Sequence, residues 1–242
     1  MTAIQYLVFA AVLIFTTTAA QEDQPRYAAK PQGGSILVRT DTILTVSETV
    51  TGSALQQIVA IGRENHLPLG IVAPDRILCS TPLIFSERAP SVQTLLAEIN
   101  QQIPTYRADL VDNTVNVEPR SLPTQDARLL DTQIGQFTSR PDTHQGMGVN
   151  LWMFVRAVLV PGESTGFAGG SSTRAEKLTG IHVEQLSVAQ ILNLIARKGH
   201  GGLWAVKSLQ PGWEKSSPSL PYEILSYCDE HSGIQDFSCP AK

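Results

Sequence analysis

Excess charge of either sign is largely absent from this chain of 242 residues. The formal net charge is −4, the sequence pI is about 5.7, and Lys and Arg are scattered rather than clustered. Binding to nucleic acid or to an anionic membrane surface requires a concentration of basic side chains. The composition therefore predicts no nucleic-acid partner.

Cysteine is also scarce, with three residues in the chain. Cys228 and Cys239 lie close together in a polar, turn-rich segment, and in an oxidising compartment such a pair closes a short disulfide loop. Cys79 is then left over, in an apolar setting that favours a small buried side chain over a reactive thiol. His231 lies between the two paired cysteines, but no compact fourth ligand follows at a usual spacing, so we expect no metal site and no cofactor.

A long apolar run is missing as well. The run at residues 7–15 has nine residues, whereas a helix needs about 20 to cross the bilayer core. Thr18, Ala19 and Ala20 follow it and suit cleavage by signal peptidase. We expect residues 1–20 to be a signal peptide, the protein to be exported (periplasmic or extracellular), and the mature chain to have no stable membrane insertion. No Lys or Arg precedes the run, so a retained anchor is the alternative.

Two segments of the chain share one apolar pattern at an offset of 96 residues (188 − 92). Apolar residues at i, i+3, i+4 and i+7 form one stripe on a helix, which predicts two amphipathic helices. Both helices begin at a serine, and the second has Gln190 three residues after Ser187, which is a capping box. The pattern indicates either an internal duplication or two unrelated amphipathic helices. The apolar positions are Val92, Leu95, Leu96 and Ile99 in the first segment, and Val188, Ile191, Leu192 and Ile195 in the second.

The rest of the chain divides into two similar halves. Residues 21–34 lack periodicity and predict a disordered leader. Residues 35–120 and 121–209 each alternate β-rich segments with amphipathic helices, whereas residues 210–242 show no regular pattern and predict an irregular tail. The fold class is therefore α+β, with two related small βα modules whose helices pack on a short mixed or antiparallel sheet.

Several elements carry local signals. A capping box at Ser53 predicts a helix that ends near residue 65, and a strand follows at 67–72, where Pro68 indicates the start of a strand or an edge strand. A helix from 91 to about 102 leads to strands at 105–110 and 114–117, which form a hairpin around Asp112 and Asn113. In the second half we expect a strand at 129–134, a helix that contains residues 151–158, the helix that Ser187 caps, and a strand at 203–206.

The order of these elements resembles the secretin and TonB short N-terminal domain. The resemblance covers residues 53–117, where Ala54-Leu55-Gln56-Gln57-Ile58 precedes Leu69-Gly70-Ile71-Val72, and Thr94-Leu95-Leu96 precedes Tyr106-Arg107-Ala108-Asp109-Leu110. A second half-unit of the same kind covers 178–206. In that family the module is a small periplasmic domain that contacts other envelope proteins and carries no catalytic residues. The resemblance implies an envelope protein as partner, and no barrel or secretin-forming region follows it in this chain.

One motif points instead to catalysis. Residues 162–166, Gly-Glu-Ser-Thr-Gly, match the nucleophile elbow of serine hydrolases, and the apolar residues before them allow the strand that the elbow requires. The Gly/Ser-rich sequence after Ser164 is a poor helix former, so it offers no rigid support for a nucleophile. An exported serine hydrolase that uses Ser164 is the alternative function, with partners drawn from His200, His231, Asp229 and Asp236.

The function that the sequence favours is a non-catalytic, exported interaction module of the cell envelope or periplasm that contacts another protein. A third alternative is a small-ligand-binding protein that uses a groove between the modules. Trp152, Phe154 and Trp204 are the candidates to line such a groove, although large aromatic side chains of this kind also pack in cores.

Overall fold

A computed structural model describes residues 37–47, 51–72, 74, 76–122, 124–159, 177–208 and 222–227. The α+β class is confirmed. The helices are α1 (Ala54–Glu64), α2 (Arg76–Ser80), α3 (Val92–Gln102), α4 (Thr124–Asp131), α5 (His144–Leu159) and α6 (Val188–Ala196). The strands are β1 (Leu69–Val72), β2 (Tyr106–Val111), β3 (Thr114–Pro119), β4 (Gln133–Ser139), β5 (Ile181–Ser187), β6 (Leu203–Ser208) and β7 (Tyr222–Tyr227).

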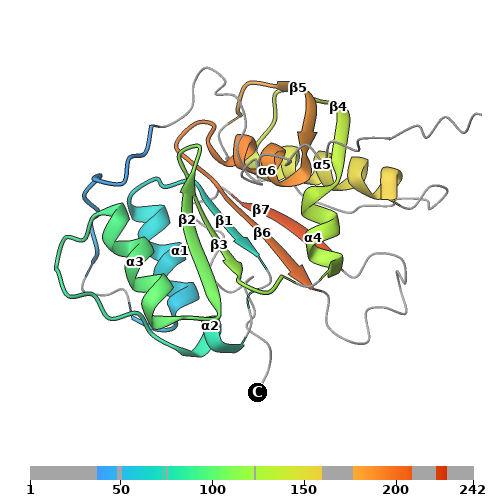
Figure 1. Ribbon diagram of the computed structural model, residues 1–242. Helices are drawn as coiled ribbons and strands as arrows, with labels where there is room; N and C mark the ends of the chain where they lie inside the picture. The colour runs from blue at the N-terminus through green and yellow to red at the C-terminus, as the bar shows by residue number, and fades with distance from the viewer. Residues whose placement is uncertain are drawn as a thin grey trace, which may run out of the picture.

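One five-stranded mixed sheet organises the molecule, in the order β2-β3-β1-β6-β7 (Figure 1). The central strand β1 is parallel to both of its neighbours, β3 and β6. The outer pairs, β2 with β3 and β6 with β7, are antiparallel. Strands from both halves of the chain therefore share this sheet, while β4 and β5 form a separate two-stranded antiparallel sheet.

Each face of the five-stranded sheet has its own hydrophobic core. On one face, α1, α2 and α3 pack over Ile71 and Ala205; on the other, α4, α5, α6 and the β4–β5 sheet pack over Val72 and Val206 (Figure 1). Successive residues of a strand point to opposite faces, so a strand between two cores must be apolar throughout. All four residues of β1 are buried accordingly.

A helix followed by a strand recurs in the structure at an offset of 134 residues (188 − 54, and 203 − 69). Both α1 and α6 begin with a complete capping box, at Ser53 and Ser187. The strands that follow, β1 and β6, pair in parallel with Leu69 beside Leu203 and Val72 beside Val206. Helix α1 packs on one face of the sheet and α6 on the other.

This recurrence differs from the sequence pattern at an offset of 96 residues. Both segments of that pattern are helices, α3 and α6, and both begin at the expected serine. However, α3 leads into the edge strand β2, whereas α6 leads into the interior strand β6. Within the described residues, the structural equivalent of α6 is therefore α1.

Other expectations from the sequence have mixed outcomes. The hairpin is confirmed: Asp112 and Asn113 form the turn with φ values of 48° and 63°. The predicted strand at 129–134 is wrong, because α4 continues to Asp131 and the strand begins at Gln133. Apolar residues are required at Leu129 and Leu130 because both are buried on one side of α4.

The expectation that residues 210–242 are irregular throughout is also wrong. Strand β7 lies within this range and pairs with β6 over its whole length, from Leu203 beside Tyr227 to Ser208 beside Tyr222. Pairing with a strand that lies about 20 residues earlier leaves no local signal, which is why periodicity alone did not reveal it.

Candidate functional site

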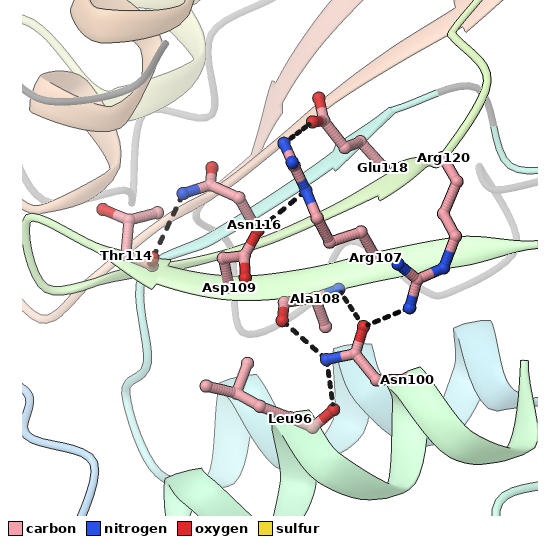
Figure 2. A network of polar contacts seen from close by, with 9 residues as sticks. All are labelled: Leu96, Asn100, Arg107, Ala108, Asp109, Thr114, Asn116, Glu118 and Arg120. Carbon is pink, nitrogen blue, oxygen red and sulfur yellow. Dashed lines mark hydrogen bonds and ion pairs between the residues drawn. The ribbon is translucent and has the colours of Figure 1, made fainter. Parts of the chain in front are cut away.

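The outer edge of β2 is closed by a side chain. The Asn100 amide of α3 accepts a hydrogen bond from the backbone N–H of Ala108 (3.1 Å) and donates to the carbonyls of Ala108 (2.9 Å) and Leu96 (2.8 Å). Arg120 also donates to the Asn100 oxygen, and Figure 2 shows the whole network. An edge strand usually attracts further strands through such outward backbone groups, so Asn100 blocks strand addition at this point of β2.

The same device holds one extended segment of the first half. Gln57 donates to the carbonyl of Leu83 and accepts from its N–H, and Gln102 does the same with Ile84. The backbone at 83–84 is thereby fixed to α1 and α3 without belonging to a strand. A side-chain amide has the same donor and acceptor pair as a peptide group, which is why Asn and Gln can substitute for a neighbouring strand.

The two-stranded β4–β5 sheet has no comparable cover. Among the described residues, β4 pairs with β5 alone and β5 with β4 alone, so each strand has one outer edge without a strand neighbour. Phe137 and Val183 face the core, and the exposed side carries polar residues. The ladder skips Gly135 and Gln185, and Gln185 has a φ of 53°, which interrupts the sheet at its middle.

The exposed side of β4–β5 carries a small polar group. His182 Nδ1 lies 2.8 Å from the Thr138 hydroxyl, and His182 Nε2 lies 3.6 Å from a carboxylate oxygen of Glu184. The Glu184 side chain is 68 % exposed. This sheet face therefore offers hydrogen-bonding groups on both β4 and β5.

A second polar surface lies on the β2–β3 hairpin, on the sheet face opposite α3 (Figure 2). Arg107 pairs with Asp109 (2.8 Å) and with Glu118, whose side chain is nearly buried. Polar residues at every second position of β2 and β3 place these groups on one face. The sequence contains this alternation, in Arg107 and Asp109 and in Asn116 and Glu118; it predicts a hairpin but not the ion pairs between its strands.

Burial shifts the pKa of His144, on α5. Its ring is buried, Nε2 lies 3.0 Å from the carbonyl oxygen of Lys198, and Gly202 packs against the ring. Burial lowers the pKa of His144 to about 4, and the nearby Lys198 ammonium lowers it further, against the raising effect of the carbonyl contact. The ring is therefore neutral at physiological pH and donates from Nε2 to the carbonyl.

The structure separates the three aromatic residues suggested for a groove. Trp204 is 1 % exposed and Trp152 is 7 % exposed, and both belong to the core between the sheet, α5 and α6. Phe154 is 38 % exposed on α5, where its ring meets Phe137 edge to face at 5.7 Å. The two tryptophans thus occupy core positions.

Several other candidates lie outside the described residues. They are Ser164, His231, Asp229, Asp236, and the cysteine pair Cys228 and Cys239. His200 is described, and its ring lies 5.6 Å from that of His66. Cys79 is disulfide-bonded, so the expectation of a free thiol at this position is wrong. Because the chain has three cysteines, a bond at Cys79 is also incompatible with the expected Cys228–Cys239 loop.

Within the described ranges, no three His, Cys, Asp or Glu residues gather as they would around a metal ion. The helices of this part of the chain are also too short or too polar to cross a membrane. Comparisons with protein-family models, with curated proteins and with solved structures find no match to this chain.

Proposed function

We propose that this protein is an exported interaction module of the cell envelope or periplasm, and that it binds another protein by strand addition at the β4–β5 sheet. The observation that carries the proposal is the pair of outer edges on β4 and β5, which have no strand neighbour among the described residues. Strand addition joins an extended segment of a partner to such an edge through backbone hydrogen bonds.

The rest of the described surface favours this location. Helices cover both faces of the five-stranded sheet, and Asn100 occupies the outward backbone groups of Ala108 on β2. The polar groups of His182, Thr138 and Glu184 on the β4–β5 sheet suit a partner that is recognised by hydrogen bonds. Resemblance to the secretin and TonB short N-terminal domain supports an envelope protein as that partner, and the apolar run at 7–15 supports export.

Site-specific photo-crosslinking in envelope extract tests the proposal. A photoreactive amino acid replaces Glu184 on β5 or Gln136 on β4, both exposed, and the matched control replaces Gln93, which is exposed on α3. We expect one discrete protein adduct from the two β4–β5 positions and none from position 93. Absence of an adduct at 136 and 184, or the same adducts from position 93, would contradict the proposal.

A further inference from the structure

Four buried polar side chains between α6 and β3 keep hydrogen-bonding atoms that have no partner among the described residues. Arg197, Asn193 and Thr114 are 0 % exposed and Asn116 is 2 % exposed. The atoms concerned are Arg197 Nε and Nη2, Asn193 Nδ2, Asn116 Oδ1 and Thr114 Oγ1. Leaving buried polar atoms unpaired is costly, and for a charged group the cost is larger, so such a cluster requires a reason.

Contacts among these groups show that they belong to one layer. Asn193 and Arg197 are four residues apart and so lie on the same side of α6. Asn193 Oδ1 accepts from Trp204 Nε1 (2.8 Å), and the Trp204 ring and Asn116 Oδ1 both lie where a Cβ on Gly70 would be. Arg197 Nη1 donates to the carbonyl of Asp112 (2.9 Å), in the turn that leads into β3. Helix α6 therefore presents donors toward a strand that presents acceptors.

The recurring helix–strand unit shows that the fold does not require this polarity. At the offset of 134 residues, Asn193 corresponds to Val59 and Arg197 to Arg63. Val59 is a buried core residue, and Arg63 is exposed. The α1–β1 unit thus packs on the sheet with an apolar residue and an exposed arginine at the positions where the α6–β6 unit has two buried polar groups.

The unpaired edge of Arg197 defines the chemistry of a ligand. Nε and Nη2 lie on one side of the guanidinium and form the two-donor fork that matches the two oxygens of a carboxylate. Nη1, on the other side, is already engaged by the Asp112 carbonyl, and the Asp112 carboxylate lies 3.7 Å away. That carboxylate is a quarter exposed, so the guanidinium lies just beneath the surface at the β2–β3 turn.

We propose that Arg197 and Asn193 form a binding site for a small free carboxylate, with Asn116 and Thr114 receiving the polar remainder of the ligand. A carboxylate would supply two acceptors to the Arg197 fork and one to Asn193 Nδ2, together with the negative charge that a buried guanidinium needs. This site is independent of the β4–β5 edges, and it assigns a second function to the chain.

Thermal unfolding of the mature chain in increasing sodium acetate, with sodium chloride of equal ionic strength as reference, tests the site. We expect an acetate-specific rise in Tm that grows with the logarithm of free acetate and reaches about 5 °C or more once free acetate exceeds its Kd about 100-fold. Arg197→Lys keeps the charge but removes the fork, so the rise should be lost. Arg107→Lys is the matched control, because Arg107 is half-exposed and already pairs with two carboxylates, and it should retain the rise in Tm.

Asn193→Asp keeps the result interpretable if Arg197→Lys does not fold. The aspartate preserves the oxygen that accepts from Trp204 and places a carboxylate beside Arg197, so it occupies the site from within the chain. We expect this variant to unfold at a Tm that no longer depends on acetate. No acetate-specific rise in the wild-type chain, or an equal rise in Asn193→Asp, would show that the cluster holds water alone and would overturn the proposal.

Discussion

Acidification should destabilise this protein through His144. The ring is buried, it donates from Nε2 to the carbonyl of Lys198, and burial holds its pKa at about 4. In the unfolded chain the same side chain has a pKa of about 6.5. Between pH 6.5 and 4 the unfolded chain therefore binds a proton at His144 and the folded chain does not. The stability present above pH 6.5 is lost as the pH falls toward 4.

The size of the effect follows from the two pKa values. A difference of one pKa unit is worth about 1.36 kcal/mol, so a fall from about 6.5 to about 4 corresponds to roughly 3 kcal/mol in total. At pH 5 the unfolded imidazole is almost fully protonated and the folded one is about 90 % neutral. Linkage then gives a loss of about 2 kcal/mol between pH 7.5 and pH 5.

Urea unfolding at these two pH values, for the wild-type chain and for His144→Gln, measures this contribution. Glutamine can donate to the Lys198 carbonyl but does not titrate, and the difference between the two proteins cancels the contributions of all other ionisable groups. The wild-type chain should lose about 2 kcal/mol more than the variant on acidification. Equal losses in the two proteins would refute the assignment of a buried neutral His144.

Three further predictions concern other parts of the chain. Gly70→Ala should destabilise the protein by about 1–3 kcal/mol in urea titrations, because an added Cβ would clash with the Trp204 ring. Gly135→Ala is the control: its added Cβ would meet nothing within 4 Å, so the free energy of unfolding should change by less than about 0.5 kcal/mol. Similar losses of stability at both positions would contradict the packing described. Alkylation of the unfolded, unreduced chain followed by mass spectrometry should leave Cys79 unlabelled, and labelled Cys79 would rule out its disulfide. A fluorophosphonate probe should not label Ser164 above background, and labelling that Ser164→Ala abolishes would favour the serine hydrolase over the interaction module.

Local signals in the sequence predicted the elements well. The capping boxes at Ser53 and Ser187 each involve residues three positions apart, and both mark the start of a helix. The turn at Asp112 and Asn113 depends on the tolerance of these two residues for positive φ. Signals of this kind are contained within a few residues, so no knowledge of the rest of the chain is needed to recognise them.

Long-range pairing was not predictable in the same way. Pro68 suggested an edge strand or a strand start, but β1 lies in the middle of the sheet, and Pro68 only precedes it. The apolar run at 69–72 was the available sign of a strand buried on both faces. The pairing of β1 with β6, and the position of Arg197 beneath the turn at Asp112, depend on contacts between residues about 85 to 135 positions apart, for which a single sequence has no local code.

Hydrogen–deuterium exchange tests the central claim most directly. Exchange is measured for the chain alone and for the chain bound to the protein that crosslinking at positions 136 and 184 identifies. Strand addition predicts slower exchange of backbone amides in β4 or β5 on binding, because their outward N–H groups become hydrogen-bonded, and unchanged exchange in β1, whose neighbours on both sides are already strands. Protection confined to segments outside β4 and β5 would contradict the account.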